Sequence, residues 1–504
     1  MKVLLIKSSN LTARSKGATP PLGLMYIASY IRQKRHDEVE ILDTRLCKEP
    51  LKEVYRILQA FQPDIVGIGA LTFEAPAMYH IAHIVKQFTD IPVVVGGPHA
   101  TSVPHEVMGN QDIDVTVIGE GEITFKELLD ALEAGKNLTT IDGIVYRDHD
   151  MVKINKSRAY IDNLDELPFP AWDLAELEKY VNIYSINGIR FRPYMVFLTS
   201  RGCPFRCTYC HNIFGKTFRP RSAENVLAEM DVLINTYRIY EFIFLDDIPN
   251  LERERIKAIL NGIIDRNWKI HLYFTNGVRT DMLDEEIIHL MKKAGTVEIA
   301  IAIETVSPRL QKMVKKNLNV EKVKRMIEVC VDDGMFVEGF FMLGFPTETE
   351  EELRATIDFA CKSRLHEALF FLVNPFGGTE LSMQIESTMN APLNLKPEDF
   401  DYHAMPFNAS NMPDKILHRL YALAWVRFYF NPVRIFRILK TRPFHRDLPY
   451  LFILLIKDIF AAKGNKKSTF DTVNMELLKN NNKTNLLKAL NESQDKVMDI
   501  RSVK

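Results

Sequence analysis

The sequence predicts an α/β protein: a doubly wound parallel sheet, then a partial (β/α)6 barrel, then a helical C-terminal region. Short β-rich runs alternate with amphipathic stretches in two separate parts of the chain, and this alternation stops after residue 380. The length of 504 residues suggests about three domains. A hydrophobic content of 46% with 26% charged residues is typical of packed globular protein and excludes disorder as the main state.

The first α/β region covers residues 1–147. Its predicted strands are residues 3–6, 39–42, 65–68, 93–95, 115–118 and 144–146. Amphipathic stretches at 22–32, 51–61, 77–88 and 123–132 predict helices between these strands. Such alternation favours a parallel sheet with both faces covered, whose ligands bind at the carboxyl ends of the strands. Glycine-bearing loops follow the third, fourth and fifth strands, so we expect a binding site at that edge.

Residues 148–193 carry turn-forming and acidic residues with two closely spaced prolines, and they predict an extended linker. The second α/β region follows over residues 194–380. Its predicted strands are residues 194–198, 242–245, 271–274, 297–303, 336–343 and 368–373. Six units are fewer than the eight of a closed barrel and predict a partial one. Residues 381–462 are the predicted helical C-terminal region, and the lysine- and asparagine-rich residues 463–504 predict a mobile tail.

Three of the six cysteines, Cys203, Cys207 and Cys210, fall within eight residues and have the spacing C-x3-C-x2-C. Their loop lies just beyond the first barrel strand, where barrel active sites gather. Three thiolates on one tight loop can hold three irons of a 4Fe-4S cube and leave the fourth iron open. Structural zinc with His211 as fourth ligand is the main alternative, but adjacent Cys210 and His211 have difficulty reaching one tetrahedral ion. Buried structural cysteines are the weakest interpretation.

This cysteine loop, at the start of a partial barrel, resembles the hallmark of the radical S-adenosylmethionine (radical SAM) superfamily. The resemblance implies that Cys203, Cys207 and Cys210 ligate the 4Fe-4S cluster, whose open iron binds the amino and carboxylate groups of SAM. It also implies that one electron cleaves SAM to methionine and a 5′-deoxyadenosyl radical. Tyr209 stands where the superfamily places an aromatic residue near the adenine.

Four more residues resemble SAM-contacting positions of the superfamily. Asp246, at the end of the second barrel strand, resembles a contact to the SAM ammonium, whereas for the next residue, Asp247, a helix cap is an equal interpretation. Glu304 closes an apolar strand and resembles a glutamate that contacts SAM, with a cap as the alternative. Gly339 resembles a strand glycine that lets the adenine approach the backbone. Arg221 reaches the SAM carboxylate or is an ordinary solvated arginine.

The first α/β region resembles the cobalamin-binding domain that is fused to many radical SAM enzymes. The resemblance implies that these residues line the cofactor: Gly23, Gly96, Gly97, His99, Gly119, Glu120 and Gly121. Glycine loops expose backbone N–H groups and admit a bulky, phosphate-bearing ligand.

The position of the cobalt-coordinating histidine departs from the family pattern. Members with such a histidine carry D-x-H-x-x-G, but here Asp43 is followed two residues later by Arg45. An arginine has no lone pair to donate, so we expect cobalamin bound without a histidine lower ligand. Loss of the cofactor is the alternative. We interpret His99 as a pocket-wall residue rather than a cobalt ligand.

Residues 415–457 mix aromatic and cationic side chains. We favour helices that pack over the barrel mouth, because three prolines interrupt the apolar segments. The second interpretation is peripheral contact of these helices with a membrane, where arginine meets lipid phosphate. No run reaches the ~18 apolar residues of a spanning helix, and the apolar N-terminal run is too short for a signal peptide. We therefore expect a cytoplasmic protein, at most peripheral to the inner face of the membrane.

These patterns together predict a cobalamin-dependent radical SAM enzyme, a C-methyltransferase that acts on an unactivated carbon of a small-molecule or lipid-like substrate. The resemblance implies a 4Fe-4S cluster, SAM, cobalamin and an external one-electron reductant such as flavodoxin or ferredoxin. The alternatives are a radical SAM oxidative cyclase or rearrangement enzyme, like the anaerobic porphyrin-ester cyclases, and a non-catalytic iron–sulfur sensor or binding module. A net charge of −1 argues against a nucleic-acid partner.

Overall fold

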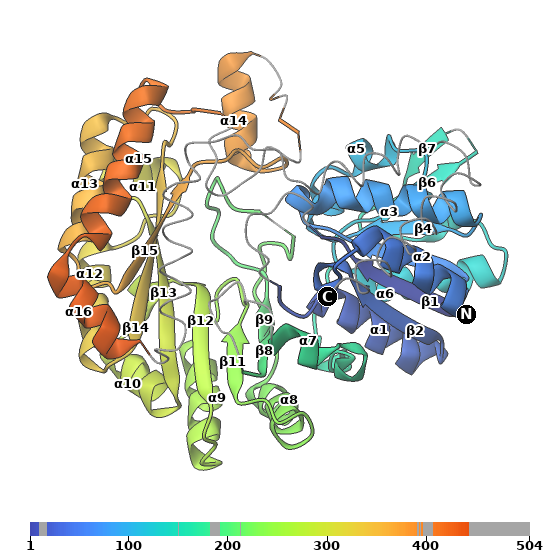
Figure 1. Ribbon diagram of the computed structural model, residues 1–504, viewed down its shortest axis with the longest axis horizontal. Helices are drawn as coiled ribbons and strands as arrows, with labels where there is room; N and C mark the ends of the chain where they lie inside the picture. Colours follow the sequence, from blue (N-terminus) through green and yellow to red (C-terminus); the bar gives the residue numbers. More distant parts are fainter. Residues whose placement is uncertain are drawn as a thin grey trace, which may run out of the picture.

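The computed structural model describes residues 1–442 with the exception of 10–17, 150, 182–191, 212, 391–392, 394 and 397–406. Two sheets covered by helices make up this part of the chain, and the chain leads from the N-terminal sheet into the second one (Figure 1). The predicted tail at 463–504 and the C-terminal region beyond residue 442 lie outside the described residues.

The N-terminal sheet has seven strands in the order β2-β1-β3-β4-β5-β6-β7. The strands are β1 (Lys2–Lys7), β2 (Glu38–Asp43), β3 (Ile65–Gly69), β4 (Val93–Gly96), β5 (Val115–Val117), β6 (Ile144–Asp148) and β7 (Met151–Ile154). The helices are α1 (Leu22–Arg35), α2 (Pro50–Phe61), α3 (Ala75–Phe88), α4 (Pro98–Ser102), α5 (Pro104–Met108) and α6 (Gly121–Glu133). The five strands β1 to β5 run parallel, as predicted. Strand β6 is antiparallel to β5, a direction that residue type alone does not encode.

Alternate residues of β1 face opposite sides of this sheet, because successive side chains of a strand point to opposite faces. Leu4 and Ile6 are buried with the apolar faces of α2 and α3. Val3 and Leu5 are buried with those of α1 and α6. Both faces are therefore covered, and only the ends of the strands remain for a ligand.

The predicted linker is a packed segment of the structure. It contains β7, which pairs with β6, and the short helix α7 (Leu177–Val181). Trp172 is only 3% exposed and shares a core with Met25 and Tyr26 of α1 and with the barrel residues. The amide of Ala171 also donates to the Met25 carbonyl at 3.1 Å. The prolines prevent regular structure here, but the apolar residues between them still bury their side chains.

The second sheet is a six-stranded, all-parallel partial barrel in the order β15-β14-β13-β12-β11-β8. The strands are β8 (Tyr194–Phe197), β11 (Glu241–Phe244), β12 (His271–Val278), β13 (Thr296–Glu304), β14 (Phe336–Leu343) and β15 (Glu367–Leu372). The helices are α8 (Ala223–Asn235), α9 (Arg253–Asp265), α10 (Glu285–Lys293), α11 (Pro308–Met313), α12 (Val320–Asp332) and α13 (Glu350–Lys362). All six strands predicted from the sequence are confirmed, and longer helices line the outer side of the sheet (Figure 1).

Two features position the rest of the chain around the barrel. A two-stranded ribbon, β9 (Ser200–Arg201) and β10 (Arg219–Pro220), follows β8 and brackets the cysteine loop. Three C-terminal helices, α14 (Glu380–Met389), α15 (Asp414–Tyr429) and α16 (Pro432–Thr441), follow β15. Helices α15 and α16 lie on the flank of the barrel opposite the N-terminal domain (Figure 1). Within the described residues, no helix combines the length and apolar character needed to cross a bilayer.

Candidate active site

The cysteine loop is a sharp excursion from the β9–β10 ribbon. It begins at Gly202, whose φ is +82° and where a Cβ would lie 2.2 Å from the Thr217 carbonyl oxygen, so only glycine fits. The amide of Thr208 donates to the Val314 carbonyl at 3.1 Å, and the Thr208 carbonyl accepts from the Leu381 amide at 2.8 Å. Main-chain bonds thus hold the loop between α11 and α14.

The three thiols of this loop are all free and none is fully buried. Burial raises the pKa of Cys203, and it raises the pKa of Cys210 to about 12 with a further contribution from Asp247. Cys203 and Cys210 are therefore protonated in the metal-free protein, and metal binding to them must release protons. In the described part of the chain, no three histidine, cysteine or carboxylate side chains converge as a site for one metal ion.

The two aspartates that follow β11 have different environments. Asp246 is 1% exposed and accepts hydrogen bonds from the Thr199 amide at 3.0 Å, the Thr199 hydroxyl at 2.7 Å and the Ser200 hydroxyl. It therefore fixes the turn between β8 and β9. Asp247 instead faces the cysteine loop, where burial raises its pKa and the charge of His211 lowers it. The charge of Asp247 contributes to the raised pKa values of Cys203 and Cys210.

Glu304 ends β13 with a φ of +65°, a backbone conformation that is rare for residues other than glycine. Its carboxylate accepts from the Lys316 ammonium at 3.0 Å, and both side chains are over nine-tenths buried. The Lys316 Nζ lies 6.0 Å from the centre of the Tyr209 ring. Glu304 and Tyr209, both predicted from the sequence, are thus brought together through a lysine that sequence reasoning missed.

A second cation that sequence reasoning missed supports the cysteine loop from β12. Arg279 stacks on Phe205, with its guanidinium carbon 3.7 Å from the ring centre. It also donates to the Lys316 carbonyl at 2.8 Å. Arg279 directly follows β12, and its position at the end of a barrel strand could have identified it as a site residue. Lys316 follows a short helix, and nothing in its sequence position indicates a role in the site.

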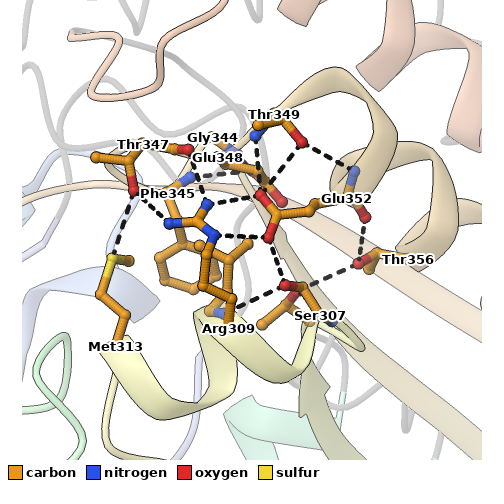
Figure 2. Close-up of polar contacts among 12 residues, drawn as sticks. Ser307, Arg309, Met313, Gly344, Phe345, Thr347, Glu348, Thr349, Glu352 and Thr356 are labelled. Atoms are coloured by element: carbon orange, nitrogen blue, oxygen red, sulfur yellow. Dashed lines mark hydrogen bonds and ion pairs between the residues drawn. The ribbon is translucent and has the colours of Figure 1, made fainter.

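The loop after β14 places an aromatic wall against Tyr209. Phe345 lies 6.0 Å from Tyr209, centre to centre. Glu348 holds this turn by accepting from the Gly344 amide at 2.6 Å and the Phe345 amide at 3.1 Å, and burial raises its pKa to about 8 (Figure 2). Arg309 of α11 donates both to Glu352 at the start of α13 and to the Thr347 hydroxyl in the turn. It thereby joins α11 to this turn. Hydrogen bonding from Arg309 lowers the pKa of Glu352 to about 2.

Two predicted SAM contacts lie in packed surroundings. A Cβ at Gly339 would approach a Leu365 methyl group to 2.6 Å, so close packing already explains this glycine. Arg221 is buried, forms an ion pair with Glu229 and donates to the Leu198 carbonyl at 2.9 Å. Among the described residues, neither side chain is hydrogen-bonded to the cysteine loop, and their roles toward SAM stay predictions.

The predicted cobalamin loops meet at the carboxyl ends of β4 and β5. Gly97 has a φ of +94° and Gly119 a φ of +78°, and the Gly119 amide donates to the Thr101 hydroxyl at 3.1 Å. The positions that a Cβ would take at Gly23 and Gly119 have no atom within 4 Å, while at Gly121 it would meet Ile27 at 2.8 Å. Gly96, at the end of β4, has ordinary packing.

His99 is 1% exposed in this edge, and its Nδ1 atom has no hydrogen-bond partner among the described residues. Its Nε2 lies 3.5 Å from the Tyr79 hydroxyl. Burial lowers the pKa of His99 to about 4, so the imidazole is neutral at physiological pH.

We expect His99 to make the protein sensitive to acid. Between pH 6.5 and pH 4 the unfolded chain binds a proton at this residue and the folded chain does not, so stability falls as the pH falls. The contribution amounts to about 3 kcal/mol. His99→Gln should flatten the pH dependence of the free energy of unfolding, measured by urea denaturation at pH 7, 5.5 and 4. His149→Gln, at a side chain 96% exposed, is the matched control; equal slopes for both variants and the parent would contradict the prediction.

The loop after β2, where related proteins carry the cobalt-coordinating histidine, contains an ion pair between Asp43 and Arg45. Arg45 pairs with Asp43 at 2.6 Å and donates to the Thr19 carbonyl at 2.5 Å. The Tyr180 hydroxyl donates to the same aspartate at 2.6 Å. Beside this pair, Lys7 forms an ion pair with Glu74, and burial lowers the pKa of Lys7 to about 8.

Glu120 connects the two domains. Its carboxylate accepts from Arg201 and from Arg219, each at 2.9 Å, and Glu122 accepts from Arg201 at 2.7 Å. All four side chains are at most 5% exposed. Glu120 follows β5, and Arg201 stands two residues before Cys203, so the edge of the N-terminal sheet is fastened to the base of the cysteine loop. Glu120 was predicted to line the cobalamin site; in the structure its carboxylate is hydrogen-bonded to two arginines of the barrel domain.

Two family models match the chain. The radical SAM superfamily model matches residues 197–360, and the B12 binding domain model matches residues 9–129. An uncharacterized methyltransferase of Pyrococcus horikoshii is 34% identical over 471 residues, which are 92% of this chain and 96% of the relative. An anaerobic magnesium-protoporphyrin IX monomethyl ester cyclase of Rubrivivax gelatinosus is 28% identical over 406 residues, 78% of this chain and 70% of its own.

A solved structure supports the arrangement of the two domains. The radical S-adenosylmethionine methyltransferase TsrM of Kitasatospora setae, solved with cobalamin and a [4Fe-4S] cluster bound, has a TM-score of 0.69. The match covers 86% of this chain and 89% of TsrM at 18% sequence identity. The chain therefore shares the two-domain fold of TsrM.

Proposed function

The chain belongs to the radical SAM enzymes that carry a B12-binding domain, and on this premise we propose that it is a cobalamin-dependent methyltransferase that methylates an unactivated carbon. One observation carries the proposal: three free thiols on a rigid loop at the barrel mouth are fastened through Arg201 to the edge of the B12-binding domain. Such an arrangement serves an enzyme in which two cofactors act on one substrate.

We propose that Cys203, Cys207 and Cys210 hold three irons of a 4Fe-4S cluster. The donor set fits, because thiolates are the preferred ligands of such clusters and all three thiols are unpaired. When bound, the cluster supplies the electron that cleaves SAM to methionine and a 5′-deoxyadenosyl radical. The protein holds this loop in place by main-chain hydrogen bonds from Thr208 to the end of α11 and to the start of α14.

The side chains around Tyr209 suit the two ends of SAM. Tyr209 and Phe345 form an aromatic wall for the adenine, and Glu304 with Lys316 offers an anion and a cation for a zwitterionic amino acid group. Lys316 is thus a second candidate, beside Arg221, for contact with the SAM carboxylate. Asp246 and Gly339 also shape the local backbone, and their contacts with SAM stay predictions.

We propose that cobalamin binds at the carboxyl ends of β4 and β5 without a histidine lower ligand. The open space at Gly23 and Gly119 and the unpaired Nδ1 of His99 fit a bulky polar cofactor. Arg45 is engaged with Asp43 and offers no lone pair to cobalt.

A radical cyclisation or rearrangement is the second candidate function. The specific observation in its favour is the 28% identity to the porphyrin-ester cyclase over 78% of this chain. A non-catalytic sensor is disfavoured, because family membership extends over both domains.

Labelled SAM separates the two enzymatic candidates. We expect the anaerobically reconstituted protein, supplied with methyl-labelled SAM, a reductant and an extract as substrate source, to release 5′-deoxyadenosine and to transfer label to a product. Deoxyadenosine without labelled product would support cyclisation or rearrangement. No deoxyadenosine with any reductant would support the sensor, and iron without bindable cobalamin would remove the methyl donor from the proposal.

The cellular compartment, the electron donor and the substrate class are proposed from the sequence. All six cysteines are free, which suits a reducing compartment such as the cytoplasm. We propose flavodoxin or ferredoxin as electron donor, a small-molecule or lipid-like substrate, and no nucleic-acid partner.

A further inference from the structure

Helix α16 has an inverted distribution of side chains. Its one buried residue is Arg434, while Val433 is 66% and Phe436 is 69% exposed. A surface helix of a globular protein ordinarily does the opposite and turns its apolar stripe toward the core. We therefore expect a partner outside the described residues to cover the exposed apolar side chains of α16.

Arg434 fixes this orientation of the helix. Its guanidinium donates to the Leu365 carbonyl at 2.6 Å and to the Cys361 carbonyl at 2.8 Å, at the end of α13. It also lies 3.5 Å from the centre of the Phe428 ring. A cation at the carbonyl end of a helix is favourable, and Arg434 takes this position at the end of α13. The contact that holds α16 on the barrel is therefore made by a charged side chain.

Exposed apolar side chains also occur on α15, at its start and at its end. Together with those of α16, we call them the α15–α16 outer surface, and they are 36–75% exposed: Ile416, Val426, Phe430, Val433, Ile435, Phe436 and Leu439. Both helices lie on the flank away from the N-terminal domain (Figure 1). Large apolar side chains exposed together on two neighbouring helices are typical of an interaction site.

The charge of this region indicates the kind of partner. From Lys415 to Arg442 the sequence has seven lysine and arginine residues and no aspartate or glutamate. Among them, Lys415, Arg419 and Lys440 are exposed and face solvent, whereas Arg434 is buried and Arg427 and Arg442 pair with Asp358 and Glu367. Apolar side chains interspersed with cations are typical of helices that lie in the headgroup region of an anionic bilayer.

Charge also argues against two other occupants. A second copy docked through the same face would bring two sets of cations together. Residues 443–504 of this chain carry 11 lysine and arginine residues against seven aspartate and glutamate residues, so they have the same sign as the surface. We infer that the α15–α16 outer surface docks the protein on an anionic lipid bilayer, with its apolar side chains in the headgroup region and its cations on lipid phosphates.

Vesicle flotation of the full-length protein tests this inference. We expect co-flotation with vesicles of phosphatidylcholine and phosphatidylglycerol, weaker binding to phosphatidylcholine alone, and weaker binding at high salt. Phe430→Ser/Phe436→Ser should reduce the partition coefficient by about tenfold. The matched control is Met151→Ser/Ile154→Ser on β7, where the side chains are 63% and 57% exposed, and it should bind like the parent.

Three results would overturn the inference: absence of binding to the anionic vesicles, equal loss in the control pair, or a dimer in the parent that Phe430→Ser/Phe436→Ser dissolves. Thermal unfolding of both pairs should match that of the parent, because all four side chains are exposed. Flotation needs neither SAM cleavage nor methyl transfer, so this test and that of the proposed function fail independently.

Discussion

Alanine in place of Cys203, Cys207 or Cys210 should reduce SAM cleavage to less than about one-thousandth of the parent rate. Each substitution removes one of three thiols that the proposed cluster needs, and no other described cysteine belongs to the loop. Cleavage is measured as 5′-deoxyadenosine formed after anaerobic reconstitution, together with the iron and sulfide content of each variant.

The matched control is Cys361→Ala, at a partly buried thiol on α13 that the proposed site does not use. It should keep both iron and cleavage. If the loop variants retain deoxyadenosine formation, the cluster assignment and the proposed function are wrong. If they lose iron but also lose their thermal transition, a cysteine-to-serine series at the same positions distinguishes cluster loss from misfolding.

Glu120→Gln should lower the free energy of unfolding by about 3 kcal/mol. The substitution keeps the shape of the side chain but removes the charge that faces Arg201 and Arg219. Arg201 keeps its ion pair with Glu122, whereas Arg219 loses the carboxylate with which it pairs, and a buried arginine without a counter-charge is costly. Because Arg201 precedes the cysteine loop, we also expect lower iron occupancy. Urea denaturation and iron analysis measure the two effects.

Glu127→Gln is the control for this effect, since Glu127 of α6 also pairs with an arginine, Arg158 of the linker, but is 40% exposed. It should cost less than about 1 kcal/mol. Parent-like stability of Glu120→Gln combined with a loss of cobalamin binding would contradict the interdomain role and restore Glu120 as a cofactor contact.

The barrel and the cysteine loop were predictable from local patterns. Strands such as 297–303 are nearly continuous apolar runs, which is what a strand with both faces covered requires. The spacing of Cys203, Cys207 and Cys210 is a chemical signal that does not depend on distant residues. The strand-end positions of Asp246 and Glu304 followed from the same alternation.

Contacts between distant segments were not predictable in this way. Lys316 reaches Glu304 because a short helix turns the chain back over the strand end, and Glu120 meets Arg201 and Arg219 over 81 and 99 residues of sequence. The sequence placed Glu120 in a glycine loop and so suggested a cofactor contact. The residues predicted as a linker likewise gave no local sign of the buried Trp172 contact.

For this protein, the sequence by itself determined the two α/β units, the thiol set and the family, because periodicity and short-range spacing are properties of neighbouring residues. Only the tertiary structure decided which carboxylate faces the thiols, which cations support the loop and which side of α16 is exposed. Burial and ion pairing depend on which chain segments come together. Asp246 and Asp247 are the same residue type in the sequence, although the structure gives them different environments.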